Sequence, residues 1–97
     1  MVPNAWNYTH LAGAGTTNIL VGIGGTAGAP NNIGLYGGVN VNTAGTTVTI
    51  TDGSGGPTLA VIGAVTGSFL APMPGQQLKN GLTVVVAGAA DVTVYWQ

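Results

Sequence analysis

Side chains able to take part in acid–base or nucleophilic chemistry are very few in this 97-residue chain. They are one histidine, two aspartates and one lysine (His10, Asp52, Asp91 and Lys79), together with the serine and threonine hydroxyls. Catalysis requires such groups within hydrogen-bonding reach of one another. Asp52 and Asp91 lie in or beside predicted turns, where an aspartate commonly accepts hydrogen bonds from nearby backbone. We therefore expect both aspartates to be structural.

Neither a catalytic triad nor a metal centre is favoured by the pattern. The serines Ser54 and Ser68 lack the strand–turn–helix context in which a nucleophilic serine is usually presented. One histidine with two separated aspartates also provides too few ligands for a transition metal. The sequence predicts no enzyme activity and no cofactor.

The glycine-rich segment GIGGTA, residues 22–27, matches the G-x-G-x-x-A pattern of dinucleotide-binding loops. In such proteins the pattern opens a helix that receives the phosphates, and an acidic residue follows about 20 residues later. Here the next residues, GAPNNIG, do not favour a helix, and no acidic residue follows at that distance. We interpret the segment as an ordinary glycine-rich loop.

The charge content excludes several classes of protein. Charged residues make up 3% of the chain, the formal net charge is -1, and cysteine is absent. A single lysine cannot form the basic surface that nucleic-acid binding requires. No run approaches the ~20 consecutive apolar residues that span a bilayer, and residues 1–10 lack the features of a signal peptide. We expect a soluble chain made in the cytoplasm that binds neither nucleic acid nor membrane.

Short runs of alternating apolar and polar residues recur along the chain, while glycine or proline interrupts almost every helical window. Alternation with a period of two places apolar side chains on one face of a half-buried strand. The expected apolar faces are Ile19/Val21/Ile23, Leu35/Val39/Val41, Val48/Ile50 and Val92/Val94/Trp96, with further apolar runs at 58–65 and 82–86. About seven strands predict a single all-β domain, an antiparallel sandwich or jelly roll over residues 15–97, after an N-terminal arm of residues 1–14.

The residues between these runs are typical of turns. Segments 42–45, 52–57 and 88–90 are predicted to close antiparallel hairpins, and Asn80–Gly81 is a strong turn dipeptide. The segment APMPGQQ, residues 71–77, is too rich in proline to be a central strand.

The aromatic residues leave two interpretations open. They could form a platform for a sugar, but such residues more often fill a core or an interface. They are Trp6, Tyr8, Tyr36, Phe69, Tyr95 and Trp96.

Low charge has a further consequence for a β protein. Soluble monomers usually protect their sheet edges with charge, lysine or proline, and this chain has one lysine. The composition therefore predicts a protein whose edges and apolar faces are covered in an oligomer or larger assembly. With so few titratable groups, we also expect stability to be nearly constant from about pH 5 to 9 and tolerant of salt.

Several segments, taken in order, resemble small virion proteins of tailed bacteriophages. These segments are VNTAGT, TDG, PMPG, NGLTVVV and GAADVTVYW. The resemblance extends over about residues 15–96 and is most specific in the C-terminal third. It implies a head decoration, or cement, protein that binds the capsid exterior as a homotrimer, contacts the major capsid protein and reinforces the shell. It carries no catalytic residue.

Within this interpretation, Trp6, Tyr8 and His10 are the predicted contacts with the capsid or a neighbour. Tyr95 and Trp96 are the predicted subunit contact. One alternative is a carbohydrate- or receptor-binding module of a phage tail or head fibre. Another is an ice-binding or other surface-adsorbing protein, suggested by the threonine-rich segment TTVTIT at residues 46–51.

Overall fold

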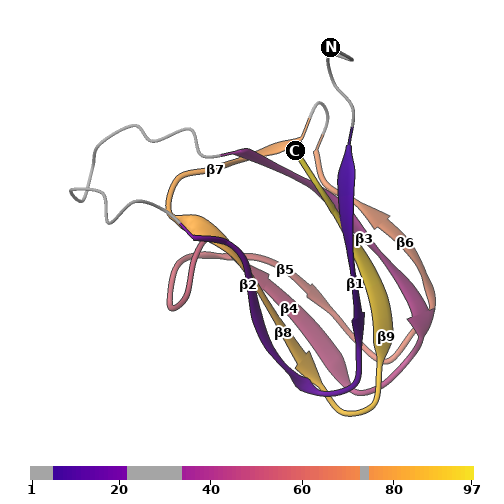
Figure 1. The fold of residues 1–97 in the computed structure, drawn as a ribbon. Helices are drawn as coiled ribbons and strands as arrows, with labels where there is room; N and C mark the ends of the chain where they lie inside the picture. The colour runs from indigo at the N-terminus through magenta and orange to yellow at the C-terminus, as the bar shows by residue number, and fades with distance from the viewer. Residues whose placement is uncertain (1–5, 22–33, 73–74) are drawn as a thin grey trace.

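The computed structural model describes residues 6–21, 34–72 and 75–97, and all regular structure in these ranges is β-strand (Figure 1). The prediction of an all-β sandwich is confirmed, with nine strands in the described ranges where about seven were expected. The strands are β1 (Asn7–Ala12), β2 (Gly15–Val21), β3 (Gly34–Thr43), β4 (Thr47–Thr51), β5 (Thr58–Ile62), β6 (Gly67–Leu70), β7 (Gln76–Leu78), β8 (Gly81–Ala87) and β9 (Asp91–Trp96).

The strands form two antiparallel sheets that pack face to face. Sheet A has the order β1-β9-β3-β6, with β7 also paired to β3, and sheet B has the order β2-β8-β4-β5. Apart from the β4–β5 and β6–β7 pairs, each strand is followed in the chain by one in the other sheet (Figure 1). A five-stranded and a four-stranded sheet linked in this way have the topology of a jelly roll, with β6 and β7 together in the place of one edge strand.

This topology corrects two of the three predicted hairpins. Residues 52–57 do join the antiparallel pair β4 and β5. However, residues 42–45 lead from β3 in sheet A to β4 in sheet B, and residues 88–90 lead from β8 in sheet B to β9 in sheet A. A chain reversal between two sheets uses the same turn residues as a hairpin, so composition alone does not distinguish them.

The structure also differs from the predicted N-terminal arm. Residues 7–12 form β1, an edge strand of sheet A that pairs with β9 over its whole length. Thr9 and Leu11 are partly buried, and Leu11 packs against the core. The sequence pattern did not indicate this strand, because the large ring of Tyr8 occupies an outward-facing position where a polar residue is typical. Residues 1–5 lie outside the described ranges.

Two of the predicted apolar faces, on β2 and β3, differ from those in the structure because these strands pair with a shift in register. The pairing of β3 with β9 shifts between Tyr36 and Gly38, so Tyr36 is buried with Val39 and Val41 while Leu35 is only half-buried. An extra residue reverses the in–out alternation of the strand beyond it. In β2 a similar shift leaves Val21 78% exposed where burial was expected. Ile23 lies outside the described ranges.

The two other predicted apolar faces, on β4 and β9, are confirmed. Val48 and Ile50 of β4, and Val92 and Val94 of β9, are buried between the sheets, and Trp96 packs at the edge of this core. The buried apolar residues are Tyr36, Val39, Val41, Val48, Ile50, Ile62, Ala71, Leu78, Leu82, Val84, Val86, Ala90, Val92 and Val94. Most are β-branched or small, which suits close packing of two pleated faces.

The described part of the proline-rich segment 71–77 forms no central strand, as predicted, and Gln76 and Gln77 belong to the edge strand β7. β6 pairs with β3 over Gly38–Val41 and β7 pairs with β3 over Gly34–Tyr36. The edge strand of sheet A is thus made of two pieces separated by residues 71–75. Since proline lacks a backbone N–H group, this position costs no hydrogen bond within the sheet.

Asp52 has a structural role, although not the local one expected. Its side chain is buried, and Oδ1 accepts hydrogen bonds from the backbone N–H groups of Lys79 (3.0 Å), Asn80 (2.8 Å) and Gly81 (3.2 Å). Lys79 also donates to Oδ2 at 3.1 Å. The carboxylate therefore connects the β4–β5 turn to the segment between β7 and β8, which is distant in sequence.

Candidate functional site

Two tyrosines meet on the outer face of sheet A. In the β1–β9 ladder Tyr8 lies directly opposite Tyr95, and because Val94 faces the core, Tyr95 faces outward. Side chains opposite one another on an antiparallel pair have Cβ atoms about 5 Å apart. Tyr8 is 70% exposed and Tyr95 is 39% exposed. The two rings therefore stand side by side on the surface.

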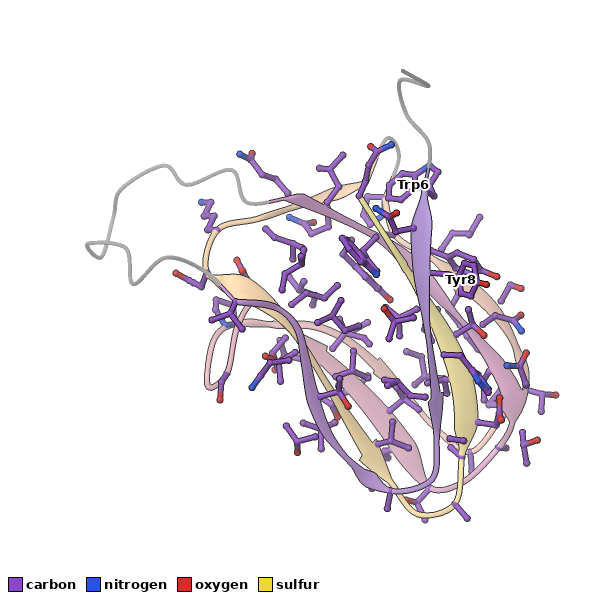
Figure 2. All side chains as sticks on the ribbon, viewed as in Figure 1. Trp6 and Tyr8 are labelled. Carbon is purple, nitrogen blue, oxygen red and sulfur yellow. The ribbon has the colours of Figure 1, made fainter. Side chains whose placement is uncertain are left out.

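Trp6 lies at the same end of the sheet, directly before β1. Its ring rests against Gly37 and Gly75: a Cβ atom placed on Gly37 would lie 2.7 Å from Cζ3 of Trp6, and one on Gly75 would lie 3.0 Å from Cη2. The two glycines thus provide the space that the indole ring occupies. Figure 2 shows Trp6 and Tyr8 along the end of β1. We refer to Trp6, Tyr8 and Tyr95 as the aromatic patch.

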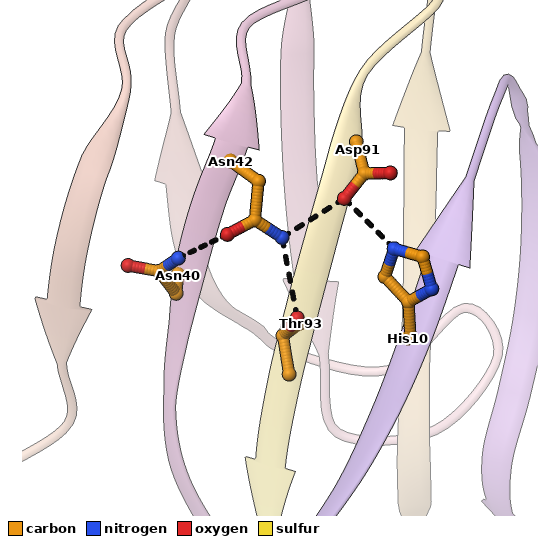
Figure 3. A network of polar contacts seen from close by, with 5 residues as sticks. All are labelled: His10, Asn40, Asn42, Asp91 and Thr93. Atoms are coloured by element: carbon orange, nitrogen blue, oxygen red, sulfur yellow. Dashed lines mark hydrogen bonds and ion pairs between the residues drawn. The ribbon is translucent and has the colours of Figure 1, made fainter.

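A continuous row of polar side chains crosses the same face. Ser68 Oγ donates to Asn40 Oδ1 (2.7 Å), and Asn40 Nδ2 donates to Asn42 Oδ1. Asn42 Nδ2 donates to Asp91 Oδ1 (2.9 Å), which lies 2.8 Å from His10 Nε2 (Figure 3). These five residues, which we call the polar ladder, come from the four strands β6, β3, β9 and β1.

Asp91 links the part of the polar ladder on β3 to His10 on β1. The predicted contact with local backbone is wrong, since its carboxylate bonds side chains on the two flanking strands. Hydrogen bonds from Asn42 and then from His10 lower the pKa of Asp91. Asn42 also donates to Thr93 Oγ1 at 3.3 Å. The ladder therefore holds a set of exposed amide, hydroxyl and imidazole groups in a fixed arrangement.

The hydroxyl groups beside the ladder are bonded to amides. Ser68 donates to Asn40 and lies three strands away from His10. Thr93, which is opposite His10 in the register, accepts a hydrogen bond from Asn42. Within residues 6–21, 34–72 and 75–97, no three acidic, histidine or cysteine side chains come together in a group that could hold a metal ion.

The structure allows the pH dependence of stability to be predicted more closely. Asp91 has a pKa below its ordinary 3.8, so it adds stability that is lost as the pH falls below about 4. Burial raises the pKa of Tyr36 from 10.0 to about 12, so stability is lost as the pH rises above about 10. Urea unfolding from pH 3 to 11 should show a plateau between these limits. Unchanged stability at both pH 3 and pH 11 would contradict this expectation.

The remaining predicted site residue, Trp96, faces the opposite way from Tyr95. Its Nε1 donates to Thr9 Oγ1 (2.9 Å), and its ring packs against the core. Successive residues of a strand point to opposite faces, so Tyr95 and Trp96 do not form one surface. Of the six aromatic residues, Tyr36, Phe69 and Trp96 pack in or against the core, whereas the aromatic patch is exposed.

The threonine row of β4 lies on the outer face of sheet B. Thr49 is flanked in register by Val85 of β8 and Val61 of β5, whereas Thr51 is flanked by Thr83 and Thr58, so hydroxyl and apolar groups are mixed on this face. Thr51 Oγ1 donates to the carbonyl oxygen of Gly53 (2.7 Å). A regular threonine array, as an ice-binding surface requires, is not formed by these strands.

Comparisons with protein-family models, with curated proteins and with solved structures gave no match for this chain. In the part of the chain that the structure describes, no helix is long and apolar enough to cross a membrane.

Proposed function

We propose that the chain is a structural virion protein that binds the outside of a phage capsid as a small oligomer, a trimer, and stabilises the shell. The observation that carries the proposal is the aromatic patch: three exposed rings on a rigid sheet, in a chain with 3% charged residues. The virion setting comes from the resemblance of the sequence segments to phage decoration proteins.

The outer face of sheet A has the arrangement of a protein–protein interface. Tyrosine and tryptophan are enriched among the residues that dominate binding energy, and they are usually surrounded by polar groups. Here the aromatic patch adjoins the polar ladder, which begins at His10, two residues after Tyr8 on the same face of β1. Trp6, Tyr8 and His10 remain the proposed capsid contacts, and Tyr95 joins them.

The surface also suits a contact that must persist in varied solutions. Neutral and apolar contacts are little affected by salt, because there is little charge to screen. A trimer that presents three such patches to one capsid gains apparent affinity by avidity, without any new contact. Stabilisation of the shell would follow from linking neighbouring capsid proteins through one decoration oligomer.

Alanine at Tyr8 or Tyr95 is expected to weaken capsid binding about tenfold or more, because aromatic hot-spot residues contribute on the order of 1–2 kcal/mol or above. Co-sedimentation with undecorated capsids measures the effect. Val85→Ala is the matched control, since Val85 is equally exposed but on the outer face of sheet B. Wild-type binding by both tyrosine variants would contradict the proposal.

A carbohydrate-binding function is the second candidate, and the polar ladder favours it. An aromatic ring can stack on the apolar face of a sugar, while adjacent amides and carboxylates bond its hydroxyls. Titration calorimetry of the purified protein with neutral oligosaccharides distinguishes the two. Millimolar or tighter binding that is lost in both Tyr8→Ala and Asn42→Ala would favour the carbohydrate module over the capsid contact.

A further inference from the structure

A second surface lies on the side of the sandwich where the edge of sheet B approaches the edge of sheet A. A groove of about 320 Å³ runs between β5 and the β6–β7 edge. Tyr36, Ile62, Phe69 and Ala71 are among its lining residues, and all of them belong to the hydrophobic core or pack against it. None of the described residues that line the groove is an aspartate, lysine or histidine. The groove is thus a place where the core reaches the surface.

Two exposed aliphatic side chains border this groove. Leu70, the last residue of β6, is 76% exposed, and Val61 of β5 is 63% exposed. Both belong to outer faces, because their neighbours Phe69 and Ile62 face the core. Exposed side chains of this size beside an apolar hollow are typical of an interaction site.

The strands that carry these residues are unprotected edges. Of the strands that the structure describes, β5 pairs only with β4, and β6 pairs only with β3. Their sequences, TLAVI and GSFL, contain no charge, lysine or proline, the residues that usually keep edge strands from pairing with other chains. Backbone groups along these edges are therefore available to a partner.

We propose that this groove is the subunit contact and that its occupant is a second copy of the chain. The inference rests on the oligomeric function proposed above. Leu70 and Val61 of one copy would pack into the hollow of the next, which at about 320 Å³ is roughly twice the size of an apolar cavity that holds benzene. In a trimer this contact is heterologous, so the protruding groups of each copy meet the hollow of the next copy around the ring.

The lack of charged side chains in the groove favours a second copy of this nearly uncharged chain over a charged partner. A charged side chain buried against this groove would lack a partner of opposite charge, which is unfavourable. The border of the groove in another copy carries no charged side chain. The contact also replaces the predicted one at Tyr95 and Trp96, which lie on opposite faces of β9.

Light scattering with the full chain, at low and high salt, tests the inference. The wild type is expected to be a salt-resistant oligomer, while Leu70→Lys and Val61→Lys should raise the dissociation constant at least a hundredfold and yield monomers. Leu70→Met, which keeps an apolar group, should remain oligomeric. Val21→Lys is the matched control, because Val21 is 78% exposed on β2, at the opposite edge of sheet B. Far-UV circular dichroism verifies that each variant is folded.

A monomeric wild type at high concentration, or an unchanged mass for both lysine variants, would overturn the inference. The inference is also overturned if Val21→Lys dissociates the oligomer as fully as Leu70→Lys and Val61→Lys do. Failure of the capsid function is seen separately: Tyr8→Ala should stay oligomeric yet fail to bind capsids. A monomeric wild type that still binds capsids would refute the subunit contact alone.

Discussion

Asp52→Ala is expected to lower the free energy of unfolding by about 3 kcal/mol or more. The substitution removes a buried carboxylate that accepts hydrogen bonds from three backbone N–H groups, that of Gly81 in a buried position and those of Lys79 and Asn80 in part-buried ones. An unsatisfied buried donor costs about 1–3 kcal/mol. For a domain of this size, a loss of about 3 kcal/mol lowers the melting temperature by more than roughly 10 °C. Thermal and urea unfolding measure both quantities.

Two further variants show whether the acceptor is responsible. Asp52→Asn keeps the shape and one acceptor oxygen, so it should lose only part of the stability. Asp91→Ala removes the other aspartate of the chain, whose carboxylate is exposed on sheet A, and it should have a much smaller effect. Equal stability of the Asp52→Ala and Asp91→Ala variants would show that the turn is held by other contacts.

The alternating patterns predicted the faces of regular strands but not those with bulges. Val48 and Ile50 pack as expected because β4 pairs with β8 in an unbroken register. In β3 the glycine pair after Tyr36 allows a register shift, and the apolar face changes from Leu35 to Tyr36. A bulge depends on the partner strand, so one strand's own sequence does not reveal it.

The candidate site depends on pairings between distant parts of the chain. The sequence indicated that Asn40 and Asn42 face away from the core, but not that they bond to Ser68 and Asp91. Tyr8 and Tyr95 become neighbours only because β1 pairs with β9 in this register. Such pairings are set by the packing of the whole sandwich, and turn residues do not specify which sheet a strand joins.

The few charged groups are distributed in a way that matters for assembly. Asp52 is buried in a turn contact, and Asp91 and His10 are bonded to each other on sheet A. The outer face of sheet B and the β5–β6 groove carry no charged side chain among the described residues. One sheet face thus combines aromatic and polar groups, while the groove offers only neutral contacts. This difference agrees with our proposal that the two surfaces serve two partners, a capsid protein and another copy.

The Trp96→Ala variant distinguishes two roles for Trp96: packing against the core, as in the structure, and the subunit contact predicted from the sequence. Since the ring packs against the core and its Nε1 bonds Thr9, we expect a loss of roughly 2–3 kcal/mol, somewhat below the cost for a fully buried tryptophan. Urea denaturation measures the loss. At temperatures where the variant is folded, its oligomer mass should equal that of the wild type.

Trp96→Phe is the matched variant, because it keeps an aromatic ring in the core but lacks the indole N–H group. It should recover most of the lost stability and leave Thr9 without its bond to residue 96. A Trp96→Ala protein that unfolds like the wild type but dissociates into subunits would place this ring at the subunit contact, as the sequence first indicated. Because Trp96 packs against the core while Tyr95 is exposed, we expect Trp96→Ala to lose stability and to keep its subunit contact.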